Sequence, residues 1–160
     1  MQRDIGAALI AVSIVAAAAS PLAAQPRPTQ PPGAKVRACS LLTKAEVKQR
    51  LPWRAALDNI PVEEEPLGPS GSSCNYPSVL IQVMPYTPNT IATARKTRKL
   101  ETLAGIGDEA YFYDNPQGYA EIYVKAGTRL LTVQANADRD VNAVKPGAID
   151  LAKALVAKLR

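Results

Sequence analysis

The sequence predicts an α+β fold, a mostly antiparallel sheet with about three helices packed on it and one disulfide bond. Three observations lead to this prediction. Consecutive apolar segments in the second half of the chain are joined by short turns, three other segments carry helix signals, and the chain has two cysteines, Cys39 and Cys74. With 47% hydrophobic residues and a net charge of +5, the composition is that of a globular protein.

The first residues, 1–24, have the three parts of a cleavable signal peptide. Positive charge at Arg3 precedes an uncharged apolar run from Ile5 to Ala19, and small residues then lead to Ala24. The run is shorter than the roughly 20 residues that span a bilayer. We therefore expect cleavage near Ala24, a periplasmic or secreted protein, and no transmembrane span after cleavage. A leader retained as an anchor is the alternative.

A proline-rich tether is expected over residues 25–35. Gln25 to Gly33 reads Gln-Pro-Arg-Pro-Thr-Gln-Pro-Pro-Gly and has no apolar periodicity, which is typical of an extended polyproline segment. Residues 36–160 then have the length of one α+β domain with its own core.

An exported location favours a disulfide between Cys39 and Cys74, because such bonds persist in oxidising compartments. A metal site is the rival interpretation. The chain has no histidine, so two thiolates would need unusual carboxylate partners to complete a tetrahedral zinc shell. We expect a structural disulfide and no metal.

The first helix is marked by a capping box. Thr43 is the N-cap, Glu46 follows three residues later, and Pro52 ends the helix. Residues 53–73 are expected to be a polar loop, which holds Glu63-Glu64-Glu65 and a Gly-Pro-Ser-rich run. Val79 to Met84 is apolar on both faces, as in a central strand.

A second helix is expected from Thr87 to about Leu103, with Pro88 in its first turn. It carries four basic residues: Arg95, Lys96, Arg98 and Lys99. Such a patch could bind phospholipid head groups, anionic polymers or an acidic protein. Basic residues late in a helix also complement its dipole, so a plain solvated face remains open. Export argues against a nucleic-acid partner.

Three strands, Glu109–Asp114, Gly118–Lys125 and Arg129–Ala135, are expected to pair in order. Asp114 would lie opposite about Gly118, and Lys125 opposite Thr128 across a short turn. This pairing puts one set of apolar side chains on a core face: Ala110, Phe112, Ala120, Ile122, Val124, Leu131 and Val133. A last helix, from Pro146 to Leu159, would cover apolar surface.

The same register gathers aromatic and polar side chains on the other face, namely Tyr111, Tyr113, Tyr119, Glu121, Tyr123, Thr132 and Gln134. Aromatic side chains with polar tips are enriched where proteins bind partners or sugars. This face is therefore the first candidate for a binding surface. If helices cover it, the tyrosines are ordinary core residues instead.

The chain offers little for catalysis or cofactor binding. Without histidine, it lacks the commonest general base near neutral pH. Asp108 and Glu109 are candidate carboxylates, but adjacent strand residues point to opposite faces, and a turn that enters a strand explains them equally. Gly105-Ile106-Gly107 precedes a strand and lacks the third glycine of a nucleotide loop. No cofactor or catalytic residue is expected.

A calcium loop is also rejected. Asp138, Asp140 and Asn142 match its first alternating ligand positions. However, Ala143 stands where the loop needs glycine, and Ile149 stands where it needs a bidentate glutamate.

Three short motifs resemble a broad set of exported bacterial domains of unknown function, many of them actinobacterial lipoproteins. These motifs are Cys-Ser-Leu-Leu-Thr from Cys39, Cys-Asn-Tyr from Cys74, and Gly-Ile-Gly-Asp-Glu-Ala from Gly105. The resemblance implies a shared architecture with the two cysteines paired, and it implies no activity. This chain lacks the lipidated cysteine after its leader, so a surface anchor does not carry over.

We therefore expect a periplasmic binding or protein-interaction module rather than an enzyme. Its partner would be an envelope protein or an anionic envelope component. Two alternatives remain: a small envelope enzyme that uses carboxylates, and a structural accessory subunit whose tyrosine patch is an assembly surface.

Overall fold

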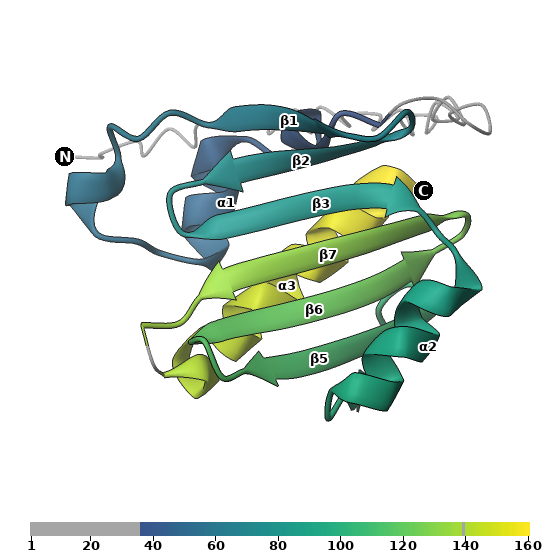
Figure 1. Ribbon diagram of the computed structural model, residues 1–160. Helices are drawn as coiled ribbons and strands as arrows, with labels where there is room; N and C mark the ends of the chain where they lie inside the picture. The colour runs from purple at the N-terminus through teal and green to yellow at the C-terminus, as the bar shows by residue number, and fades with distance from the viewer. Residues whose placement is uncertain (1–35, 139) are drawn as a thin grey trace, which may run out of the picture.

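The computed structural model describes residues 36–138 and 140–160. The predicted signal peptide and tether lie outside these residues. The described chain is an α+β domain built on one antiparallel sheet of seven strands, in the order β1-β2-β3-β7-β6-β5-β4 (Figure 1). The predicted fold class is confirmed. The strands are β1 (Glu63–Leu67), β2 (Gly71–Tyr76), β3 (Val79–Pro85), β4 (Glu101–Leu103), β5 (Glu109–Asn115), β6 (Tyr119–Ala126) and β7 (Arg129–Asn136).

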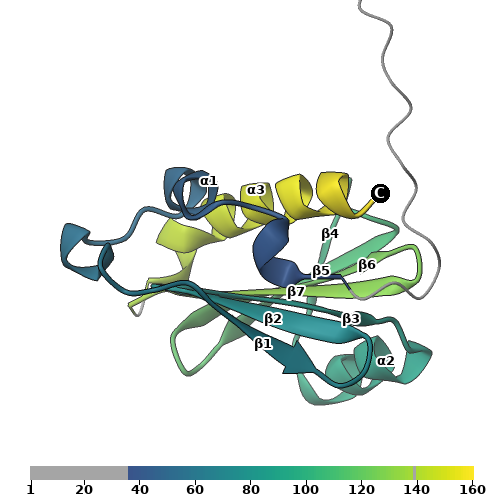
Figure 2. The same cartoon turned by 90° about the horizontal axis from the view of Figure 1, so that it is seen from above.

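The helices lie on both sides of this sheet. Figure 2 shows α1 (Lys44–Arg50) and α3 (Val141–Leu159) above one face and α2 (Pro88–Thr97) below the other. Two short 3-10 turns, η1 (Ala38–Ser40) and η2 (Ala55–Leu57), complete the described elements. The main core forms between the sheet and α3, where Ile81, Ile122 and Leu155 are fully buried.

The N-terminal part of the domain is bound to the sheet by covalent and polar contacts. Cys39, in η1, forms a disulfide with Cys74 of β2, as the sequence predicts. The Ser72 hydroxyl donates a hydrogen bond to the Val36 carbonyl and accepts one from the Ala38 amide. The predicted capping box of α1 is also present, since Thr43 and Glu46 hydrogen-bond reciprocally.

Three predicted boundaries are wrong. The second helix ends at Thr97, because Arg98 is extended and residues Glu101–Leu103 pair with β5 as strand β4. The expected loop at 53–73 contains β1 and the start of β2, which pair as a hairpin, and the exposed Glu63 and Glu65 make β1 look like a polar loop in the sequence. The last helix begins at Val141, since the Asp140 carboxylate caps it by accepting a hydrogen bond from the Ala143 amide.

The two faces of the C-terminal strands are as predicted, although the pairing differs. Asp114 lies opposite Ala120 and Lys125 lies opposite Leu130. Gly118 and Gly127 have φ angles of 86° and 60°, so both belong to turns rather than to strands. Each shift is even, which leaves every side chain on its predicted face. All seven predicted core residues of these strands are buried.

Candidate binding face

The sheet face turned away from α3 carries mostly polar side chains, and we call it the open face. Successive strand residues point to opposite faces, so the register brings side chains of different strands into rows across the sheet. One row consists of Asn75, Leu80, Gln134, Glu121 and Tyr113. The next consists of Ser73, Gln82, Thr132, Tyr123 and Tyr111.

Helix α2 covers one end of the open face. Ile91 of α2 is buried against Tyr111 and Leu130, and Met84, Tyr86 and Leu100 surround this small apolar cluster. Tyr111 is therefore a core residue with only 6% of its surface exposed. Helix α2 covers this one of the candidate binding tyrosines, whereas Tyr113, Tyr119 and Tyr123 are half-buried.

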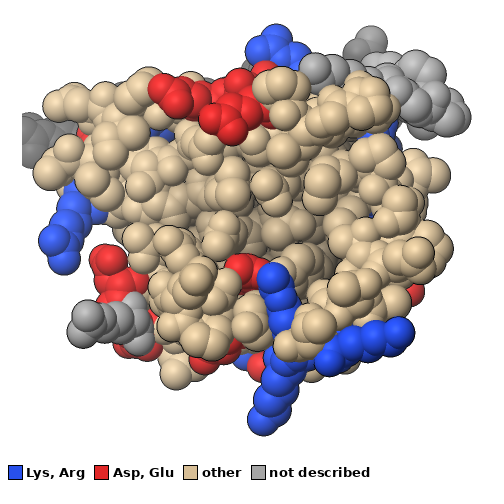
Figure 3. All heavy atoms as spheres, in the orientation of Figure 1, with Lys and Arg blue, Asp and Glu red and all other residues tan. Residues whose placement is uncertain are grey.

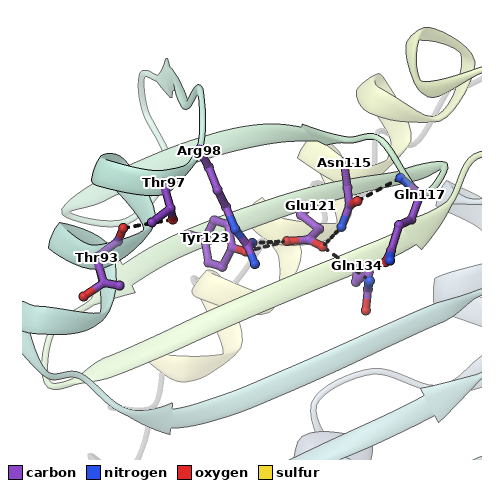
Figure 4. A network of polar contacts seen from close by, with 8 residues as sticks. All are labelled: Thr93, Thr97, Arg98, Asn115, Gln117, Glu121, Tyr123 and Gln134. Carbon is purple, nitrogen blue, oxygen red and sulfur yellow. Dashed lines mark hydrogen bonds and ion pairs between the residues drawn. The ribbon is translucent and has the colours of Figure 1, made fainter.

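Glu121 lies at the centre of a polar network on the open face (Figure 4). Its carboxylate accepts hydrogen bonds from Arg98 Nη1 at 2.8 Å and from Asn115 Nδ2 at 2.5 Å. The Tyr123 hydroxyl donates to the same group, and Gln134 Nε2 lies 3.4 Å away. The Glu121 side chain is only 8% exposed, and these donors replace the water that a charged carboxylate loses on burial.

Arg98 links α2 to this network. Its guanidinium lies 4.9 Å from the ring centroid of Tyr113 and 5.8 Å from that of Tyr123, within the range of cation–π attraction. Burial and the hydrogen bond to Glu121 raise the pKa of Tyr123. The phenol is the donor in its hydrogen bond to the Glu121 carboxylate.

The predicted basic patch divides into two parts. Arg95 stacks 4.5 Å from the ring centroid of Tyr111 and lies 3.9 Å from Glu109, and Arg98 is occupied by Glu121. Lys96 and Lys99 are exposed, and neither forms an ion pair within the described residues. They are the two basic side chains of this patch that remain free for an anionic partner.

Two adjoining hollows lie at the end of the open face farthest from the start of α2, and we call them together the sheet-end hollow. They share Tyr119 and Asn136. The smaller, of about 190 Å³, is lined by Asn75, Tyr76, Pro77, Ser78, Val79, Leu80, Tyr119, Gln134 and Asn136. The larger, of about 430 Å³, is lined by Arg54, Gln117, Gly118, Tyr119, Asn136 and Asp138.

Sequence reasoning identified Tyr119 and Gln134 but missed the other amide side chains of the sheet-end hollow. Asn75 is the second-last residue of β2, Gln117 lies in the β5–β6 turn, and Asn136 ends β7. These positions are far apart in the chain, and only the order of the strands brings them together. One feature of the sequence could have pointed to these three residues, since each of them lies in or close to a turn.

Two groups of exposed charged side chains lie along opposite borders of the open face. Glu63 and Glu65 of β1 are exposed along one border, and the basic residues of α2 lie along the other. Figure 3 shows acidic atoms over β1 and basic atoms over α2, with largely uncharged surface between these two groups; further acidic atoms lie at the lower left and beside the basic atoms near α2.

The candidate catalytic carboxylates have structural partners. Asp108 accepts a hydrogen bond from the Gly127 amide at 2.7 Å, and Glu109 accepts one from the Tyr111 hydroxyl at 3.2 Å. A third hollow, beside Arg37, Glu64, Pro66 and Ser72, contains one acid, as does the larger part of the sheet-end hollow. In none of these three hollows do two acids converge.

Asp140 of the rejected calcium loop is a helix cap, as described above. Within residues 36–138 and 140–160, no three cysteine or acidic side chains lie close enough to hold a metal ion. No described helix is long and apolar enough to cross a membrane.

Comparison of the chain with protein-family models, with curated proteins and with solved structures finds no match. The motif resemblance to exported bacterial domains therefore stays a prediction.

Proposed function

We propose that this protein is exported and that its domain is a binding module, which recognises another component of the cell envelope through the open face. The observation that carries the proposal is the character of this face. Beyond α2 it presents half-buried Tyr113, Tyr119 and Tyr123 beside the amides of Gln82 and Gln134. A sheet face that serves only as core would be apolar, like the opposite face of the same strands.

The contacts between side chains of the face also support binding. Glu121 and Arg98 hold the aromatic side chains through hydrogen bonds and ring contacts. A surface that is ordered before it meets its ligand loses less conformational entropy on binding. The disulfide between Cys39 and Cys74 supports the proposed export, since such bonds persist outside the reducing cytosol.

Site-specific photo-cross-linking in the native host tests this proposal. A photoreactive phenylalanine analogue is introduced into the full chain at Gln82, on the open face, or at Lys153, an exposed position of α3 on the opposite side. We expect the Gln82 probe to form one dominant adduct and the Lys153 probe to form none. Equal labelling from both positions, or labelling from Lys153 alone, would contradict the proposal.

Two variants identify the part of the surface that binds. Tyr113→Ala removes an aromatic group from the open face, whereas Lys96→Glu with Lys99→Glu reverses the two free charges in α2 and just after it. Loss of the Gln82 adduct in the first variant alone locates binding on the open face. Loss in the second alone assigns binding to the basic residues. An adduct with a second copy of the chain would instead indicate an assembly surface.

A further inference from the structure

The amide side chains of the sheet-end hollow lie around Tyr119, the aromatic residue that borders both of its parts. Asn75, Gln117, Gln134 and Asn136 line the two parts of this hollow, and Tyr119 borders both. A carboxamide offers two donors and one acceptor group in a plane. Neighbouring hydroxyl groups of a sugar, each able to donate and to accept, match this arrangement.

The charge of the hollow indicates a neutral ligand. The smaller part is lined by no charged residue. The larger part has Arg54 and Asp138, whose opposite charges balance. Its volume of about 430 Å³ is within the roughly 300–1,000 Å³ of pockets that hold small ligands.

The backbone around the hollow argues against an added peptide strand. A peptide that extends a sheet needs a strand edge with free backbone groups. Here the Asn136 amide donates to the Ser78 carbonyl and the Ala137 amide donates to the Gly118 carbonyl, each at 2.9 Å. The hollow lies at the ends of central strands, whereas the edges of the sheet are β1 and β4.

We propose that the sheet-end hollow binds a neutral glycan chain, with the amides of Asn75, Gln134 and Asn136 hydrogen-bonded to sugar hydroxyls and Tyr119 against the apolar face of a sugar ring. This inference rests on the proposed binding function and names its ligand class. The hollow is open to solvent, so a chain longer than one sugar unit can lie along it.

Titration of the isotope-labelled full chain followed by NMR tests the inference. The probes are cellotetraose and tetra-N-acetylchitotetraose, with tetragalacturonate as the charged comparison. We expect saturable shifts of the backbone amides of Ser78, Gly118, Tyr119 and Asn136 with at least one neutral probe. Tyr119→Ala and Asn75→Ala should each weaken binding about tenfold or more, since truncation of an interface anchor has effects of this size.

Gln49→Ala is the matched control, because Gln49 is an exposed amide side chain of α1, on the opposite side of the sheet, and lines neither part of the hollow. It should bind as the unchanged protein does. The spectrum of each free variant shows whether the fold is intact. If neither neutral probe causes saturable shifts, or if only the charged probe binds, the inference is overturned. An adduct between the Gln82 probe and an envelope protein would then leave the binding function standing without the glycan.

Discussion

Arg98 Nη1 donates a hydrogen bond of 2.8 Å to Glu121 Oε2, which joins the residue after α2 to the middle of the sheet. The two side chains differ in exposure, at 37% for Arg98 and 8% for Glu121. A buried carboxylate that loses its cation is left without either that partner or water. Loss of the Arg98–Glu121 pair should therefore destabilise the domain more than loss of a surface ion pair would.

Removal of the Arg98 side chain should therefore destabilise the domain. We expect Arg98→Ala to lower the free energy of unfolding by about 1–2 kcal/mol, because Glu121 loses a charged hydrogen-bond donor. In a Glu121→Gln background the same substitution should have a smaller effect, since no buried charge is left unpaired. Urea unfolding of the four proteins in this cycle measures the coupling. If Arg98→Ala lowered the free energy of unfolding by the same amount in both backgrounds, the two side chains would not be coupled and the prediction would be contradicted.

Loss of the disulfide should have the largest single effect on stability. Cys39 and Cys74 are separated by 35 residues, and closure of a loop of this length contributes about 3–4 kcal/mol in the chain-entropy model. Unfolding in denaturant, with and without a reducing agent, measures the difference. A Cys39→Ala/Cys74→Ala variant is the control and should not respond to the reductant. A change well below this range would show that the other η1 contacts suffice.

Gly147→Ala should destabilise α3, although alanine normally favours a helix over glycine by up to about 1 kcal/mol. A Cβ at Gly147 would lie 2.3 Å from the Arg50 carbonyl oxygen, because α1 approaches α3 closely there. At the exposed position 153 of the same helix, Lys153→Ala should be more stable than Lys153→Gly. Thermal unfolding distinguishes the two sites, and a stabilised Gly147→Ala variant would refute the close approach.

The domain should lose stability as the pH rises from about 10 to about 12. Burial raises the pKa of Tyr76 to about 12, whereas the pKa of a tyrosine in the unfolded chain is about 10. In this range the unfolded chain gives up the proton and the folded domain keeps it, so the stabilisation present below about pH 10 is lost as the pH rises. Tyr123, whose pKa is also raised, acts in the same direction.

Tyr76→Phe isolates the contribution of one phenol. At neutral pH the variant should be less stable by about 1–2 kcal/mol, because the hydrogen bond from the Tyr76 hydroxyl to the Leu42 carbonyl is lost. Its free energy of unfolding should also fall less steeply above about pH 10. Urea unfolding at a series of alkaline pH values measures both effects. The same alkaline slope in both proteins would exclude Tyr76 as a source.

The elements that rest on local interactions could be predicted from the sequence. Thr43 and Glu46 mark the start of α1 because a capping box involves only neighbouring residues. The alternation from Ala110 to Phe112 and from Ala120 to Val124 assigns each side chain to a face, since a strand has a period of two residues. The pairing of Cys39 with Cys74 needed only the count of cysteines and the expected compartment.

The edges of the sheet and the site itself could not be predicted in this way. Strand β1, with exposed Glu63 and Glu65, is a strand only because β2 pairs with it. Three residues separate strand β4 from the end of α2, and β4 pairs with β5. The burial of Tyr111 depends on where α2 docks. Asn75, Tyr119 and Asn136 meet because β2, β3, β7 and β6 are neighbours in the sheet.

The sequence by itself thus determined the fold class, the inner and outer faces of the C-terminal strands, and the start of α1. The tertiary structure alone decided which part of the tyrosine-bearing face is covered and where a hollow forms. The physical reason is the separation along the chain of the residues that interact. Capping and side-chain alternation act between neighbours in the chain, whereas strand order and helix docking depend on contacts between distant residues, which local periodicity does not record.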